Sequence, residues 1–166
     1  MLEVAKKHQD KLTQRFYDIR FNDYYKFFSL SSYYSDTTYS ADDWNEFNYV
    51  GVDKHGEPQA MFRAWADRDS MVVTELSLVN FGQSPVDFYS DFKMFITRLI
   101  DVGMRMVCFS VAVGNPAEKT YDRFIKRYGG RIVGTHKEHA KLIDGKYYDI
   151  KMYEIRTDIL KGLLRP

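Results

Sequence analysis

The feature that most constrains this chain is a strand–helix–strand pattern over residues 71–113. Residues 71–80 (MVVTELSLVN) are rich in β-branched side chains and predict a strand. A stretch with helical period follows, and the almost unbroken apolar run at 104–113 (MRMVCFSVAV) predicts a second strand that is covered on both faces. Two strands joined through a helix are expected to be parallel, with a right-handed crossover.

Local signals define the ends of the connecting helix. Ser84 can cap its start, Pro85 suits the first helical position, and Gly103 can end it. Between these limits, apolar side chains at helical spacing predict a stripe that faces the sheet. The members of this stripe are Phe88, Tyr89, Phe92, Phe95, Ile96 and Leu99.

Residues before this unit predict an antiparallel meander. Strands are expected at 47–52 and 59–66, separated by a turn that contains Gly56 and Pro58. The first 45 residues predict a mainly helical segment that is dense in aromatic side chains, with a weak helix-start signal at Ser40 and Asp43. These aromatics are expected either in core and hairpin packing or in a substrate wall or oligomer interface.

A second helix and a hairpin complete the chain. Asn115 is the expected helix cap, with Glu118 three residues later as in a capping box. Gly129 ends the helix, and strands follow at 131–142 and 146–155. After a helical N-terminus the element order is β-β-β-α-β-α-β-β. We therefore expect one domain over 1–166 with an α/β fold and a mixed sheet, made of a helical segment (1–45) and a sheet core (46–166).

Composition narrows the classes of partner. The chain has 24 Lys and Arg against 23 Asp and Glu, so its charge of +1 gives no field that would attract nucleic acid or an anionic membrane. Cys108 is the single cysteine, which excludes an intramolecular disulfide and suits a reducing compartment. No apolar run approaches the ~20 residues that span a bilayer, and the N-terminus is too polar for a signal peptide. A cytoplasmic protein is expected.

The expected topology places a ligand site beyond two strand ends. In open α/β sheets, ligands bind past the carboxyl ends of parallel strands, here Asn80 and Val113. Each is followed by a helix start, whose free amides and positive dipole end suit a phosphate. We expect an anion-tolerant notch at residues 80–84 and a polar rim near Asn115.

This element order resembles the GNAT acetyltransferase superfamily over residues 47–155. The resemblance is most specific at 115–134 (NPAEKTYDRFIKRYGGRIVG) and at the closing strand KYYDIKMYEI. It implies that the two parallel strands part and hold the pantetheine arm of acetyl-CoA between them, while the following loop and helix start hold the phosphates. The residues to which it assigns cofactor binding are Ser77, Leu78, Val79, Gly82, Gln83, Ser84, Asn115 and Lys119.

The resemblance also implies an acyl-CoA-dependent N-acyltransferase that moves an acetyl group to a small-molecule or protein amine. Glu75 would be the general base and Tyr121 the acid that protonates the leaving thiolate. The phosphate loop departs from the family pattern Gln/Arg-x-x-Gly-x-Gly/Ala, because it has one glycine, no Arg or Lys, Pro85 without an amide, and Asp87. The alternative is a non-catalytic module of the same fold, whose residues 16–49 contact a protein partner or a second copy of the chain.

Each candidate residue also has a plain structural explanation. Glu75 could reach solvent or pair with an arginine, Tyr121 could fill the core, and Lys119 could lie on a solvated helix face. His136 and His139 are expected on opposite faces of a strand, which excludes joint metal binding. We expect no metal site, and we expect Cys108 to be a buried small hydrophobe.

Overall fold

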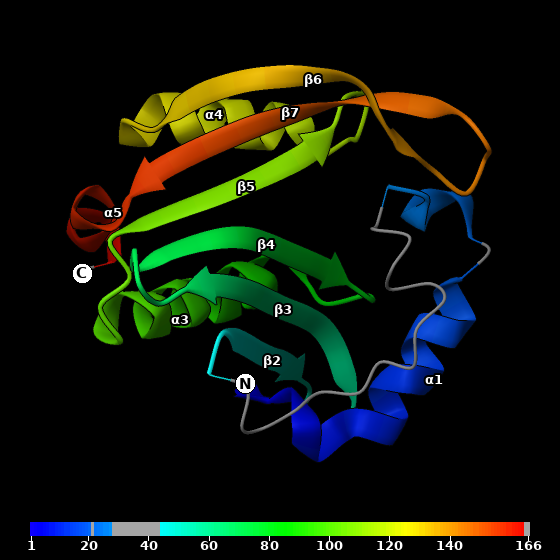
Figure 1. The fold of residues 1–166 in the computed structure, drawn as a ribbon. Helices are drawn as coiled ribbons and strands as arrows, with labels where there is room; N and C mark the ends of the chain where they lie inside the picture. The colour runs from blue at the N-terminus through cyan, green and yellow to red at the C-terminus, as the bar shows by residue number, and fades with distance from the viewer. Residues whose placement is uncertain (21, 28–43, 165–166) are drawn as a thin grey trace.

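A mixed sheet of seven strands organises the chain (Figure 1). The computed structural model describes residues 1–20, 22–27 and 44–164. Its strands, in the spatial order β1-β2-β3-β4-β5-β7-β6, are β1 Leu2–Val4, β2 Glu46–Val52, β3 Pro58–Asp67, β4 Val72–Asn80, β5 Met106–Ala112, β6 Arg131–Lys141 and β7 Tyr147–Arg156. The helices are α1 Gln9–Ile19, α3 Pro85–Asp101, α4 Glu118–Tyr128 and α5 Thr157–Leu164, with short 3-10 turns at Ala5–His8 and Asp23–Tyr25.

The predicted element order is confirmed, with two additions. The first residues were expected to be helical, but Leu2 is buried and β1 pairs antiparallel with β2. Helix α5 follows β7 and buries Leu160 in the main core. The expected helix start at Ser40 lies outside the described residues. None of the helices in the described ranges is long and apolar enough to cross a membrane.

Strands β4 and β5 are parallel, as predicted, but they pair only at their beginnings. Val72 lies opposite Met106 and Val73 opposite Val107, and the pairing stops there. At the same point β4 gains one residue relative to β3, because Trp65 pairs with Glu75 while the next residue of β3 pairs with Val73. Such a bulge increases local twist, which turns the two strands apart. Figure 1 shows them separating toward their tips.

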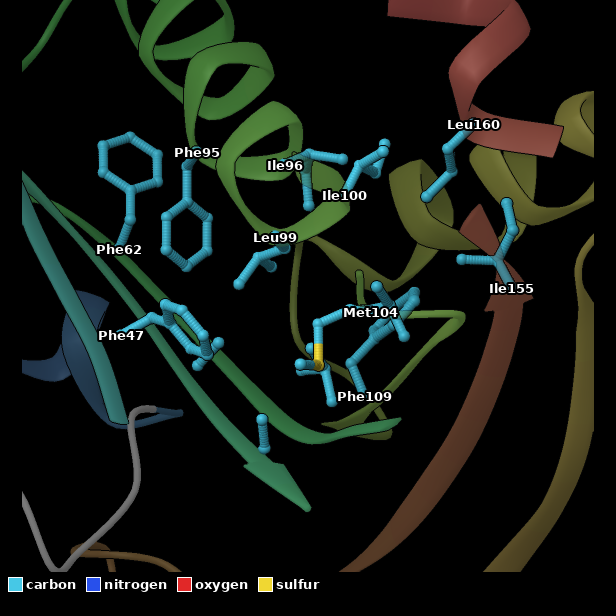
Figure 2. Packing of buried hydrophobic residues seen from close by; sticks show 14 of the residues in the cluster. Phe47, Phe62, Phe95, Ile96, Leu99, Ile100, Met104, Phe109, Ile155 and Leu160 are labelled. Carbon is cyan, nitrogen blue, oxygen red and sulfur yellow. The ribbon is translucent and has the colours of Figure 1, made fainter. Parts of the chain in front are cut away.

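Helices cover the two faces of the sheet in different places. Phe95 and Leu99 of α3 pack on Phe62 of β3 in the main core, to which α4 and α5 also contribute (Figure 2). Leu12 of α1 lies in a second cluster with Met61. Since successive residues of a strand point to opposite faces, α1 covers one face of β3 and α3 the other.

Helix α3 has the predicted ends but a rotated buried stripe. The side chain of Ser84 caps it by accepting a hydrogen bond from the amide of Asp87. Tyr89, expected in the stripe, is 55% exposed, whereas Asp91 is 4% exposed. Tyr89 instead lines a shallow hollow on the outer side of α3, together with Met94. The prediction for Tyr89 is therefore wrong, because the polar Asp91 occupies the inward position.

Strand β5 is covered along its whole length on one face only, contrary to prediction; on the other face Ala112, at its end, is buried. Val107, Phe109 and Val111 are buried on the side of α3 and α4. The alternating residues point the other way, where Ser110 is exposed and Cys108 is only partly buried. An apolar run alone does not reveal how many helices cover it, so it overstated the burial of Cys108.

A bulge also overturns the expectation for the two histidines of β6. The register of β6 against β7 shifts between His136 and Ala140, and Glu138 has a φ of 45°. The shift brings the rings of His136 and His139 into a stack with centroids 4.8 Å apart. Within the part of the chain that the structure describes, no group of three or more His, Cys, Asp or Glu residues could hold a metal ion.

Candidate functional site

The diverging strands leave backbone groups of β4 without a strand partner. The amide of Phe81 donates to a carbonyl of β3 at 2.8 Å. In an antiparallel pair every second residue bonds to the same neighbour, so Ser77 and Val79 direct their backbone groups to β3. Leu76 and Leu78 direct theirs toward β5, which has already moved away. We call the space between β4 and β5 beyond Val73 and Val107 the gap. Of the three residues predicted to bind the pantetheine arm, Leu78 directs its backbone groups into the gap, whereas Ser77 and Val79 do not.

The opposite rim of the gap follows the same rule. The amide of Val113 donates to the carbonyl of Asp149 at 2.8 Å, in register with the β5–β7 pairs. Alternation therefore turns the backbone groups of Cys108 and Ser110 toward β4. Both rims carry strand-edge groups that an extended chain containing amides could bond, as in strand addition.

Glu75 lies on the β4 rim, and no described residue pairs with its carboxylate. It pairs in register with Trp65 and belongs to the sheet face opposite α3. Its side chain is exposed, and it makes no hydrogen bond or ion pair within the described ranges. No arginine of the described ranges pairs with Glu75: Arg63, nearby on the same face of β3, bonds to Glu46 at 3.0 Å. Glu75 is therefore available to accept a proton.

Tyr121 lies on the other side of the gap. It extends from α4, is partly buried, and packs edge-on against Phe109 of β5 with ring centroids 5.3 Å apart. Burial raises the pKa of its hydroxyl. That hydroxyl makes no hydrogen bond to any described residue, although the ring is well packed. Tyr121 thus combines the expected core role with a hydroxyl that none of the described residues engages.

A charged network, which sequence reasoning missed, fixes α4 against β7. The Lys151 Nζ donates to Glu118 Oε1 and to Asp122 Oδ2, both at 2.9 Å, and the Tyr153 hydroxyl donates to Asp122 Oδ1 at 2.9 Å. These carboxylates raise the pKa of Lys151. The pKa of Asp122 is lowered mainly by Lys151, and the pKa of Glu118 is lowered first by the amide of Gly114 and then by Lys151. The network holds α4, the helix that carries Tyr121, against β7. Its only signal in the sequence was the i, i+4 spacing of Glu118 and Asp122 on one helix face.

The predicted anion notch is filled by the protein itself. Asn80 Oδ1 accepts hydrogen bonds from the amides of Gly82 and Gln83 at 2.8 and 2.7 Å, and Asn80 Nδ2 donates to the Gln83 carbonyl at 3.0 Å. Ser84 Oγ accepts from the Asp87 amide at 3.2 Å and donates to the Asp87 carboxylate at 2.7 Å. The amides of Gly82, Gln83 and Asp87, which were expected to face a phosphate, therefore already have acceptors.

Acetyl-CoA, which the resemblance implies, fits this arrangement in one half only. The gap offers unpaired backbone groups of Leu76 and Leu78, which suit the amide-bearing pantetheine arm. The loop offers the phosphates little, because two of its amides are bonded to Asn80 and residues 80–92 contain no Lys or Arg. The fit is therefore good for the arm and poor for the pyrophosphate.

The start of α4 differs in detail from the expected capping box. The helix begins at Glu118, and Asn115 Oδ1 accepts from the Ala117 amide at 2.9 Å. The Glu118 carboxylate accepts from the amide of Gly114 at 3.0 Å instead of that of Asn115. Asn115 thus organises the turn into the helix, while Lys119 is exposed one residue beyond its start.

The described part of the aromatic N-terminal segment reaches across the ends of the parted strands. The Tyr25 hydroxyl donates to the Asn80 carbonyl at the end of β4, at 3.0 Å. Lys26 Nζ lies 3.4 Å from Asp144, and the Phe27 ring packs against Tyr148 in the β6–β7 hairpin. Residues 22–27 therefore connect the two sides of the sheet beyond the gap; the remaining aromatics up to residue 43 lie outside the described ranges.

Known structures share this fold, although no protein-family model and no curated protein matches the sequence. The acetyltransferase of the GNAT family from Streptococcus pneumoniae superposes with a TM-score of 0.71 at 13% identity, covering 94% of this chain and 98% of its own. An N-acetyltransferase from Staphylococcus aureus Mu50 gives 0.66 at 14% identity, covering 94% and 97%. A GNAT superfamily phosphinothricin acetyltransferase from Sinorhizobium meliloti, solved in complex with AcCoA, gives 0.64 at 14% identity, covering 94% and 87%.

Proposed function

Since the chain has the GNAT fold, we propose that it is an acyl-CoA-dependent N-acyltransferase that moves an acetyl group from acetyl-CoA to the amine of a small molecule or a protein. The observation that carries this proposal is the parting of β4 and β5 after Val73. It leaves the backbone groups of Leu76 and Leu78 to bond an extended amide chain, as an added strand would. Fold likeness alone would not suffice.

The proposed chemistry uses one proton acceptor and one proton donor. When bound, acetyl-CoA supplies an activated acetyl thioester. Glu75 accepts the proton that the amine loses as its nitrogen bonds to the acetyl carbon, and Tyr121 donates a proton to the sulfur as the carbon–sulfur bond breaks. Glu75 and Tyr121 lie on opposite faces of the sheet, which supports these separate roles. The amine can approach from the side of Glu75, and acetyl-CoA from the side of α4.

The remaining predicted residues have supporting roles in this proposal. Asn115 shapes the rim at the start of α4, and Lys119 is exposed where it could meet the 3′-phosphate of CoA. Gly82, Gln83 and Ser84 border the gap but make their hydrogen bonds within the loop. Ser77 and Val79 hold β4 to β3, which keeps the rim in place.

Two measurements test the proposal together. Acetyl-CoA at 100 times its Kd should add about 2.7 kcal/mol of stability, which raises Tm by roughly 5–10 °C in a domain of this size. A panel of primary amines, including polyamines, amino acids and a lysine-rich peptide, should then release free thiol from acetyl-CoA. The proposal fails if millimolar acetyl-CoA leaves Tm unchanged and no amine releases thiol.

The self-bonded loop favours a second candidate, a non-catalytic module of the same fold. In that case residues 22–27, which bridge β4 and the β6–β7 hairpin, would present a docking surface for a protein. The two candidates are separated by turnover: a monomeric protein in light scattering that acetylates any amine in the panel excludes the module.

A further inference from the structure

We propose that the acyl donor is recognised through its pantetheine thioester arm and not mainly through the phosphates of CoA, so that simple pantetheine thioesters retain most of the binding free energy of their CoA counterparts. This inference rests on the donor side of the proposed function and goes beyond it by naming which half of the donor is bound. It follows from the contrast between the two parts of the site: an open strand edge for the arm and a closed loop for the phosphates.

The loop amides carry the first part of the argument. A phosphate at a helix start is held by free amide hydrogens. Here the Asn80 carboxamide oxygen takes the amides of Gly82 and Gln83 at 2.8 and 2.7 Å, as a phosphate oxygen would. Pro85 has no amide hydrogen, and the Asp87 amide is bonded to Ser84. Among the described residues, the amides of Ser84 and Val86 are the ones left without an acceptor at this helix start. Asn80 thus serves as an internal substitute for the anion.

Charge gives the second part of the argument. Residues 80–92 contain no Lys or Arg, and Asp87 is an exposed carboxylate in the first turn of α3. The second carboxylate, Asp91, is buried and lies 3.6 Å from the N-terminal ammonium, so that cation is already paired. A pyrophosphate placed at this loop would therefore meet the charge of Asp87 and no positive side chain from the loop. Lys119 on α4 is exposed, and an exposed ionic contact contributes little to binding.

The loop is also anchored in its closed form. The carbonyl of Asn80 accepts from the Tyr25 hydroxyl, and Gln83 Nε2 donates to the buried carboxylate of Asp91 at 2.7 Å. Freeing the two amides for a phosphate would require the Asn80 side chain to give up its hydrogen bonds to Gly82 and Gln83, which lowers the apparent affinity by the fraction of molecules that open. The arm meets no such barrier, since Leu76 and Leu78 have no strand partner on the gap side within the described residues.

Calorimetry on the full chain tests this directly, with CoA, pantetheine and adenosine 3′-phosphate 5′-diphosphate as probes. We expect pantetheine to bind within about tenfold of CoA, because the phosphates add few charge-assisted bonds, and we expect the nucleotide alone not to compete. A CoA preference above about tenfold, or competition by the nucleotide, overturns the inference but leaves the proposed function standing. Binding of neither CoA nor pantetheine overturns both.

Asn80→Ala adds a second, independent readout. It frees the amides of Gly82 and Gln83, so CoA should bind at least about fivefold more tightly while pantetheine changes less than about twofold. Asp53→Ala is the matched control, because Asp53 Oδ1 likewise accepts two amides, at 2.8 and 2.9 Å, in the β2–β3 turn; it should alter neither affinity. Unchanged or weaker CoA binding by Asn80→Ala contradicts the inference. If that variant does not fold, Asp87→Asn is the substitute, because it removes the carboxylate charge at the start of α3. It should increase the affinity for CoA, relative to the natural protein, more than the affinity for pantetheine.

Discussion

Replacing Lys151 with methionine should destabilise the protein far more than replacing a typical surface lysine. Lys151 is 18% exposed at its side chain and bonds to Glu118 and Asp122 of α4, both at 2.9 Å. Methionine keeps the apolar stem but removes the charge, so two neighbouring carboxylates lose their cation. Hydrogen bonds to charged groups contribute about 1.5–3 kcal/mol each, and removing one member of a buried pair costs about 3–5 kcal/mol.

The expected loss is smaller than these values suggest, because solvent reaches part of the network. Asp122 is 37% exposed, so water can replace some of its lost contact. We therefore expect Lys151→Met to lower the free energy of unfolding by about 2–3 kcal/mol, which corresponds to roughly 4–12 °C in Tm. Urea titration followed by circular dichroism measures the first quantity, and a thermal melt the second.

Lys137→Met provides the control. Lys137 makes a shorter contact, 2.7 Å to Asp149, but its side chain is 82% exposed. Exposed pairs contribute about 0–1 kcal/mol, so this variant should melt within about 4 °C of the natural sequence. Equal losses for the two lysine variants would refute the reasoning, since burial and not distance is what separates them.

The pH dependence of this difference has a definite sign. Both Glu118 and Asp122 have a pKa lowered by folding. A lowered pKa adds stability above the unfolded values, about 4.3 for Glu and 3.9 for Asp, and this contribution is lost as pH falls through the folded values. The difference in free energy of unfolding between the natural sequence and Lys151→Met should therefore shrink below about pH 4. A difference that grows on acidification would contradict the assigned role of Lys151 as the cation that pairs with these carboxylates.

Three further substitutions test the site and its frame. Glu75→Gln should lower the rate of thiol release about 100-fold or more with Tm changed by less than about 1 °C, since Glu75 is exposed; an unchanged rate would exclude it as the base. Tyr121→Phe should lower kcat while KM for acetyl-CoA stays constant; a change in KM alone would indicate a packing role. In the natural protein, burial raises the pKa of Tyr121, so loss of its proton should not lower the rate between pH 6 and 9. Gly130→Ala should cost about 1–3 kcal/mol in urea titration, because a Cβ there would lie 2.8 Å from the Glu154 carbonyl; a neutral effect would show that the backbone adjusts.

The overall architecture was predictable because its determinants are local. Ser84 and Pro85 at the start of α3, Gly129 after α4 and the Asp144–Gly145 turn each act over a few residues. The parallel pairing of β4 and β5 follows from the helix between them. Short elements without strong local signals, β1 and α5, were missed because burial of Leu2 and Leu160 in the core stabilises them.

The candidate site was less predictable, because its properties depend on contacts between distant segments. The same residues that suggest a phosphate loop also form a turn closed by Asn80, and only the observed hydrogen bonds distinguish the two. The network of Lys151, Asp122 and Tyr153 joins β7 to α4 across about thirty residues of chain. No local pattern reveals such a pairing.

Face assignments failed at individual residues, through a shift of register in β6 and without one in α3. Glu138, with its φ of 45°, reverses the expected separation of His136 and His139. Asp91 takes the inward position on α3 that the apolar stripe assigned to Tyr89. In both cases a period derived from sequence was correct on average but wrong at the residue that mattered.

Amide hydrogen exchange, measured by NMR with and without a pantetheine thioester, tests the central claim most directly. The account predicts that the amides of Leu76 and Leu78 exchange rapidly in the free protein and slow down when the ligand binds, while those of Ser77 and Val79, already bonded to β3, do not change. Unaltered exchange at Leu76 and Leu78, with ligand-induced changes at Tyr89 and Met94 on the outer side of α3 instead, would contradict it.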